Sequence, residues 1–232
     1  MRTVLALALL VLVSGCASLG TQPNPADPWE RFNRGSYAFN DAIDRNVLKP
    51  VAQSYVEGMP AFAQEGVTNF FDNLQDLGTG ANNLLQGKFS EGFSDLGRFA
   101  FNTVVGIGGL WDVATPAGLE KHNEDFGQTL GWWGVPPGPY FVIPLLGPST
   151  LRDAPARWVD PSFAYNRGID EVAIRNSMFG LDLVRTRTEL LKAEKVLDEA
   201  ALDKYSFTRD AWLQRRRNHV HDGRPPRDPE DE

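Results

Sequence analysis

One segment of this 232-residue chain restricts its fold more than any other. The 26 residues from Phe126 to Leu151 carry no charge, and their length and apolarity suit a membrane segment. Five prolines and four glycines between positions 131 and 148 exclude a regular helix there. Irregular backbone is tolerated at membrane depth only where it packs on protein or lines a water-filled cavity. Two interpretations stay open: a hairpin that lines an amphipathic passage, or a proline-rich loop that caps a soluble core.

The rest of the sequence predicts helices, because apolar residues recur at helical spacing and alternating strand patterns are almost absent. Asp27 as N-cap, Pro28 at the first helical position and an acidic residue after them start a helix that we expect to end at Pro50. We expect a mainly α-helical fold with further helices at about 60–85, 89–105, 170–201 and 204–217. Apolar residues nearly vanish from residues 218–232, so these are predicted to form a disordered tail.

The only cysteine, Cys16, follows a secretory signal. Arg2 precedes an apolar run of about ten residues, too short for a bilayer span, and Leu12-Val13-Ser14-Gly15-Cys16 has the form of a lipobox. We therefore expect residues 1–15 to be removed, Cys16 to be acylated and residues 16–26 to form a flexible tether. Ala17 after the cysteine favours sorting to the outer membrane of a bacterium.

Charge and motifs give little support for nucleic-acid binding or catalysis. The mature chain of 217 residues has a formal charge of −8, which disfavours nucleic acid, and the run from Arg215 to Arg217 is interpreted as a solvated helix end. Glu124 and Asp125 are adjacent, so they point in different directions, and a helix N-terminus explains them. We assign no catalytic residue and no metal site, and expect no enzyme activity. The six tryptophans lie mostly near Gly, Pro or Asp, as in membrane-interface proteins, although interior packing gives the same pattern.

An ordered set of motifs resembles a known family, the MlaA or VacJ outer-membrane phospholipid-transport lipoproteins. The resemblance covers residues 27–217, the domain expected between the tether and the tail. The motifs that carry it are Asp27-Pro28-Trp29-Glu30, Phe32-Asn33-Arg34, Lys49-Pro50-Val51-Ala52, Asn69-Phe70-Phe71-Asp72-Asn73-Leu74, Asn83-Leu84-Leu85-Gln86-Gly87, Gly106-Ile107-Gly108-Gly109-Leu110, Glu124-Asp125-Phe126-Gly127-Gln128-Thr129-Leu130-Gly131, Gly147-Pro148-Ser149 and Asp203-Lys204-Tyr205.

The resemblance implies an all-α, ring-shaped protein whose amphipathic helices lie in the periplasmic leaflet of the outer membrane. It implies removal of mislocalised phospholipid from the outer leaflet through a central amphipathic channel, and no cofactor besides phospholipid as the transported ligand. The implied partners are a trimeric porin and a periplasmic lipid carrier of the MlaC type. The hairpin falls where the family's channel wall lies, and the residues expected to line it are Trp132, Trp133, Pro139, Tyr140, Val142, Ile143, Leu145 and Leu146.

Two other functions compete with a lipid conduit. A lipoprotein that only scaffolds porins is the main alternative, and the uncharged hairpin argues against it because a scaffold needs no apolar lining. A cell-wall or lipid hydrolase is the other, and the sequence argues against it because it offers no nucleophile and no separated pair of acids.

Overall fold

The computed structural model describes residues 24–160 and 168–226. It confirms the mainly α-helical fold, with one short antiparallel hairpin among the described residues. The elements are α2 (Glu30–Ile43), the π-helix η1 (Asp44–Leu48), α3 (Lys49–Gly58), α4 (Ala61–Leu85), α5 (Phe89–Val104), α6 (Phe126–Trp132), β1 (Tyr140–Ile143), β2 (Gly147–Thr150), α7 (Asp153–Val159), α9 (Val172–Ala200) and α10 (Lys204–Val220).

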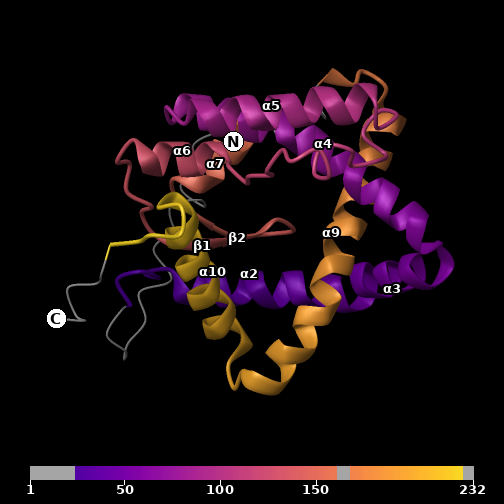
Figure 1. Cartoon of the computed structure of the whole chain (residues 1–232). Coiled ribbons are helices and arrows are strands. Elements are labelled where there is room, and N and C mark those ends of the chain that lie inside the picture. Colours follow the sequence, from indigo (N-terminus) through magenta and orange to yellow (C-terminus); the bar gives the residue numbers. More distant parts are fainter. Residues whose placement is uncertain (1–23, 161–167, 227–232) are drawn as a thin grey trace, which may run out of the picture.

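The helices trace a closed frame around the hairpin (Figure 1). Helices α2 and α3 form one side, α4 leads away from α3, and α5 returns alongside α4. Helices α6, α7 and α10 close the end near the start of α2, while α9 runs from the side of α4 to α3. The hairpin points from the α10 end into the middle of the frame.

The α4–α5 pair is the most extensive packing in the described chain, and small residues allow it. A Cβ atom on Gly80 would lie 2.9 Å from Leu96 Cγ and 3.0 Å from the carbonyl oxygen of Gly92. The two backbones can therefore approach only because position 80 has no side chain. Between them Asn83 donates a buried hydrogen bond to Asp95 at 2.8 Å.

The first predicted helix does not end at Pro50. The π-helix joins α2 to α3, and Pro50 occupies the first turn of α3, where a missing N–H costs no intrahelical hydrogen bond. Helix α3 ends instead at Gly58, because Met59 precedes Pro60 and is held in an extended conformation. The expected start of α4 at Pro60 is confirmed, with Pro60 as its N-cap residue.

The uncharged segment divides into three parts. Its first seven residues form α6, which ends before the first proline, Pro136, so no regular helix runs through the proline-rich part. Residues 133–139 are irregular, and β1 then pairs with β2 from Tyr140 opposite Thr150 to Ile143 opposite Gly147. The short helix α7 after the hairpin is absent from the sequence-based expectations.

The C-terminal helix extends past its predicted end at Arg217 to Val220. Val220 is buried against Gly131 of α6, and Lys88 forms an ion pair with Asp222 at 2.5 Å. These contacts hold residues 218–222 against the frame, which corrects the prediction that the disordered tail begins at residue 218. Residues 227–232 lie outside the described residues.

Candidate functional site

The predicted acylation site lies outside the described residues, together with the signal peptide and most of the tether. The described chain begins at Asn24 and enters the frame through Asp27, which is fully buried. Asp27 accepts hydrogen bonds from Asn33 (2.7 Å) and from the hydroxyl of Tyr205, and it pairs with Arg209 at 3.2 Å. The end of the tether is therefore joined to α2 and α10.

Two asparagines of α2 hold the hairpin. Asn33 and Asn40 are seven residues apart, so they lie on one face of the helix, and each side-chain amide forms one donor and one acceptor bond with the backbone of the hairpin. Asn33 covers the edge of β1 that β2 leaves open, and Asn40 bonds the turn that follows β1. The four bonds, donor first, are Asn33 Nδ2 to Tyr140 O (3.1 Å), Val142 N to Asn33 Oδ1 (2.9 Å), Asn40 Nδ2 to Ile143 O (3.0 Å) and Leu145 N to Asn40 Oδ1 (2.7 Å).

Six of the eight predicted lining residues lie together on the hairpin or just before it. Tyr140 and Val142 point into a small apolar core shared with α2 and α10, and each is 1% exposed. Pro139, Ile143 and Leu146 are half-buried, while Leu145 at the tip is 61% exposed. The accessible surface of the hairpin is therefore its tip and not Tyr140 or Val142, and the lining role of these residues stays a prediction.

The other two predicted residues lie elsewhere. Trp132 and Trp133 end α6 beside the turn between α4 and α5, where Lys88 Nζ lies 4.7 Å from the centre of the Trp132 ring. The indole N–H of Trp133 donates to the carbonyl oxygen of Leu85 at 3.1 Å. Both residues are about half exposed, so these tryptophans belong to the outer surface near α5 and not to the hairpin.

Helix α5 has an inverted distribution of polarity. Asp95, Arg98 and Asn102 are spaced three and four residues apart, lie on one face and are buried. The opposite face is apolar and open, with Phe93 66% and Val104 81% exposed. A helix of a water-soluble protein buries its apolar stripe instead. The exposed face of α5 therefore suits an apolar environment, and its buried face suits a polar protein interior.

Arg98 is the centre of the polar interior. Its side chain is 2% exposed and forms ion pairs with Asp76 of α4 at 3.2 Å and with Asp112 of the following loop at 3.3 Å. The same guanidinium donates to Thr115 Oγ1 at 3.0 Å and to the carbonyl oxygen of Leu119 at 2.7 Å. Burial raises the pKa of Asp76 to about 6 even beside Arg98. The pair thus fixes the loop after α5 against α4 at a considerable cost in desolvation.

A second, partly buried cluster forms around Arg216, which corrects the view of this residue as part of a solvated helix end, while Arg215 is exposed. Arg216 donates to both oxygens of Asp125, at 2.5 and 2.6 Å, and to both oxygens of Asp153 at 3.0 Å. Burial by itself would raise the pKa of Asp125, but the bonds and charge of Arg216 outweigh it and hold the pKa at about 2. A Cβ atom on Gly127 would lie 2.4 Å from Arg216 Nη2, so only glycine leaves room for the guanidinium.

The expected roles of Glu124 and Asp125 are confirmed. Asp125 is the N-cap of α6 and accepts from the N–H of Gln128 at 2.9 Å. Glu124 turns the other way, toward Gln86 at 2.8 Å and Lys88 at 3.2 Å. Each acid therefore has a structural partner, and in the described part of the chain no group of His, Cys, Asp and Glu has the arrangement to hold a metal ion.

Two polar cavities adjoin inside the frame. One, of about 410 Å³, lies among α4, α6, α7 and α10, and the other, of about 320 Å³, lies between α4 and α9. They share Gln75, Thr79 and Asn123 as a common wall. Arg185 of α9 lines the second cavity and pairs with Asp72 of α4 at 3.2 Å. Volumes of this size are typical of ligand sites, and the polar walls suit a charged or hydrogen-bonding group.

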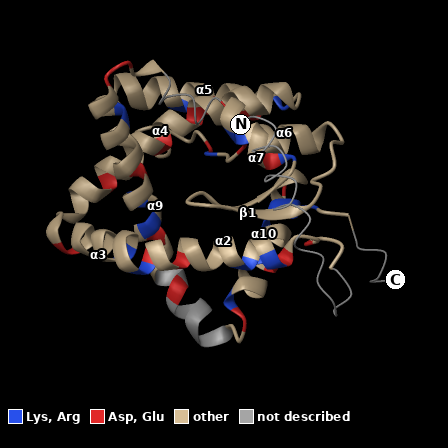
Figure 2. Cartoon of the chain, turned by 180° about the vertical axis from the view of Figure 1, so that it is seen from behind, with Lys and Arg blue, Asp and Glu red and all other residues tan. Residues whose placement is uncertain are grey.

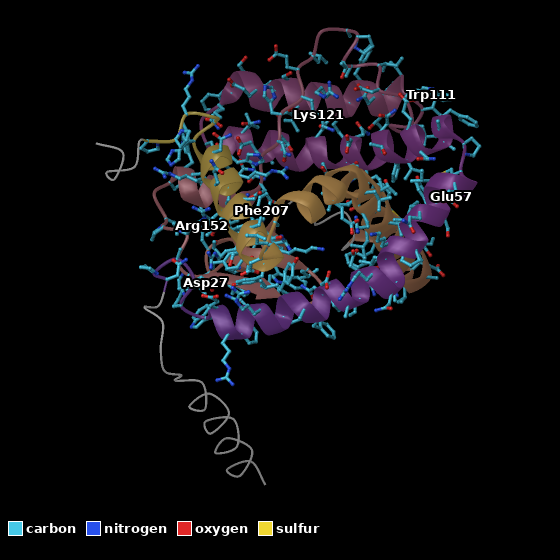
Figure 3. The ribbon with its side chains drawn as sticks, turned by 90° about the horizontal axis from the view of Figure 1, so that it is seen from below. Asp27, Glu57, Trp111, Lys121, Arg152 and Phe207 are labelled. Atoms are coloured by element: carbon cyan, nitrogen blue, oxygen red, sulfur yellow. The ribbon has the colours of Figure 1, made fainter. Side chains whose placement is uncertain are left out.

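The outer surface is rich in large apolar residues. Five of the six tryptophans are 45–58% exposed, which favours the membrane-interface interpretation over interior packing. The ribbons of α2, α3, α4 and α5 are mostly free of charge, while charged residues gather along α9 and α10 (Figure 2). Trp111 and Glu57 lie at one end of the frame, opposite Asp27 and Arg152 (Figure 3). None of the helices in residues 24–160 and 168–226 combines the length and apolarity that crossing a membrane requires.

Sequence reasoning missed the residues that organise this interior. Asn33, Arg98 and Arg216 follow no catalytic or ligand-binding motif, and a polar residue at helical spacing is normally expected to face water. The sequence did contain one signal for a polar inner face of α5, namely the apolar stripe on the other side of the helix. Aromatic residues at helical spacing along that stripe indicate a helix with one apolar and one polar side. That signal does not tell which side faces inward.

Comparisons with known proteins agree with this arrangement. The sequence pattern of the family described as "MlaA lipoprotein" matches residues 25–219. The chain is similar to the intermembrane phospholipid transport system lipoprotein MlaA of Escherichia coli (strain K12), with 35% identity over 92% of this chain and 86% of the relative. It is 31% identical to the Haemophilus influenzae protein of the same name, over 96% of this chain and 92% of the relative. A solved structure from work on the maintenance of bacterial outer membrane lipid asymmetry superimposes with a TM-score of 0.73, at 33% identity, over 84% of this chain and 98% of that one.

Proposed function

The chain belongs to the MlaA lipoprotein family, and from this premise we propose that it acts in intermembrane phospholipid transport and maintains the lipid asymmetry of the outer membrane. The observation that carries the proposal is the inverted polarity of α5, with its exposed apolar face and its buried Asp95, Arg98 and Asn102. An apolar exterior suits contact with acyl chains, and a polar interior suits the passage of a charged headgroup. A protein that only scaffolds porins needs neither in this combination.

The mechanism we propose places the frame in the periplasmic leaflet of the outer membrane, anchored by the acylated Cys16 and by its apolar exterior. A phospholipid that leaves the outer leaflet passes the tip of the hairpin at Leu145, with its headgroup toward the polar interior and its acyl chains along the apolar wall. The polar interior lowers the cost of moving a charged headgroup past hydrocarbon. The lipid then moves to a periplasmic carrier of the MlaC type, and a trimeric porin holds the protein in place. The protein itself makes and breaks no covalent bond in this process.

Loss of the acyl anchor tests the proposed location. Cys16→Ala should prevent acylation and remove most of the protein from the outer-membrane fraction, because the described chain has no helix that crosses a membrane. Membranes are fractionated after a carbonate wash, which releases protein bound only through its surface. Ser18→Ala, two residues away, serves as the matched control. Retention of the Cys16→Ala protein in normal amounts, together with full complementation of a deletion strain, contradicts the anchor.

Deletion of the gene tests the proposed function against the scaffold. Phospholipid should accumulate in the outer leaflet, and the cells should become sensitive to detergent with chelator, because bilayer patches in that leaflet admit apolar agents. An acyltransferase that acts only in the outer leaflet reports the amount of surface phospholipid. Unchanged surface phospholipid, with porin assembly impaired, would favour the scaffold.

A further inference from the structure

The larger cavity contains arginines in two different states. Arg216 is neutralised by Asp125 and Asp153, as described above. Arg157 of α7 and Arg215 of α10 also line this cavity, but within residues 24–160 and 168–226 no carboxylate lies within ion-pair distance of either. Arg157 donates one hydrogen bond, to the carbonyl oxygen of Leu146 at 3.2 Å, and Arg215 lies 3.5 Å from a ring nitrogen of His219.

The five acidic residues that line the cavity each bond to donors of the protein itself, whereas Arg157 and Arg215 have no carboxylate within ion-pair distance in the described chain. The pairs are Glu124 with Lys88, Asp125 and Asp153 with Arg216, Asp160 with Asn82, and Asp182 with Arg185.

Burial sharpens the contrast between the arginines. The pKa of Arg157 is lowered by burial, whereas that of Arg216 is raised because its two carboxylates outweigh burial. Arg157 therefore pays for desolvation without a counterion at hydrogen-bond distance, and a bound anion would supply one.

We propose that Arg157 and Arg215 bind the phosphodiester of a phospholipid headgroup in this cavity. The assignment rests on the proposed function and adds to it a residue-level binding site. Planar guanidinium groups suit the oxygens of a phosphate, and a cavity of about 410 Å³ is large enough for a headgroup. Arg157 bonds to the backbone of the hairpin turn, so the site adjoins the tip that we place along the lipid's path.

The test measures binding to the full-length lipoprotein purified in a maltoside detergent, which has no phosphate. The ligands are dihexanoyl phosphatidylethanolamine, dihexanoylglycerol, which lacks the phosphate, and inorganic phosphate. We expect the phospholipid to bind more tightly than the other two. Arg157→Gln and Arg215→Gln should each weaken its binding about tenfold, the effect of losing a hydrogen bond to a charged group. Arg31→Gln, an exposed arginine of α2, should leave binding unchanged.

Two features keep the test decisive. Arg215 is exposed, so its variant keeps the fold if Arg157→Gln does not, and Arg157→Lys should retain part of the affinity because it keeps the charge. Equal binding of phospholipid by wild type and both glutamine variants overturns the proposal, as does equal binding of dihexanoylglycerol. Inorganic phosphate binding as tightly as the phospholipid overturns the assignment to a lipid headgroup. Normal surface phospholipid in the deletion strain would contradict the proposed function without changing this result, so the two failures are distinguishable.

Discussion

Replacing Arg98 by Met should lower the free energy of unfolding by about 3–5 kcal/mol, because it leaves the carboxylate of Asp76 buried without its partner. Asp76 is 1% exposed, and burial already raises its pKa to about 6 with Arg98 present. Without Arg98 that pKa rises further above the ordinary pKa of an unfolded aspartate, so over a wider pH range the folded state keeps a proton that the unfolded state releases. The deficit should therefore be larger at pH 8 than at pH 5, since stability is lost as the pH rises toward the folded-state pKa.

Denaturant titration of the detergent-solubilised protein, followed by tryptophan fluorescence at both pH values, measures this difference. Arg31→Met on the exposed side of α2 is the matched control and should change stability by less than about 0.5 kcal/mol. The double variant Arg98→Met with Asp76→Leu should recover part of the loss, because it removes the unpaired charge as well. Equal stability of Arg98→Met and wild type would show that the buried pair does not hold the loop.

The same substitution at two positions of the hairpin should have opposite outcomes. Val142→Asp places a carboxylate in the core beside Tyr205, so we expect a loss of stability on the order of 4 kcal/mol and a fall in protein abundance together with function. Leu145→Asp lies at the exposed tip, where φ is +67°, a region that aspartate tolerates. This variant should keep normal abundance and lose transport, because a charge beside sliding acyl chains costs about 2–3 kcal/mol.

Steady-state abundance, circular dichroism and the surface-phospholipid reporter, measured on the same strains, separate these outcomes. Leu145→Asn is the matched control, since asparagine suits the same backbone conformation and adds no charge. Full transport in a well-folded Leu145→Asp protein would remove the hairpin tip from the proposed lipid path. Normal abundance of Val142→Asp would contradict the buried position of Val142.

Local sequence signals predicted most of the helices, and their reasons are visible in the structure. Helix α4 starts directly after Pro60 and α10 starts at Lys204, as expected, and the side chain of Asp203 caps α10. Helix α2 differs, because it starts at Glu30 with Trp29 and not the expected Asp27 as its N-cap residue. The ends of helices were harder to predict, because they depend on tertiary contacts. Val220 continues α10 past Arg217 by packing on α6, and no pattern within the helix itself announces that contact.

The orientation of side chains could not be predicted from periodicity. The spacing of Phe93 and Val104 establishes that α5 has an apolar stripe, but the stripe faces outward and the arginine behind it faces inward. In the hairpin, side chains of a strand alternate between two faces, but the sequence does not tell which face packs on the helices. Hydrogen bonds from Asn33 and Asn40, about a hundred residues earlier in the chain, determine that face.

Those two asparagines also make the attachment of the hairpin sensitive to the medium. Through four hydrogen bonds, Asn33 takes the place of a neighbouring strand along β1 and Asn40 holds the turn that follows it. Breaking these bonds in hydrocarbon leaves N–H and C=O groups without partners, at several kcal/mol for each group, whereas water satisfies the same groups. Acyl chains do not compete for the bonds and water does. In the absence of water the hairpin therefore stays bound to α2, and each water molecule that enters lowers the free-energy cost of separating them.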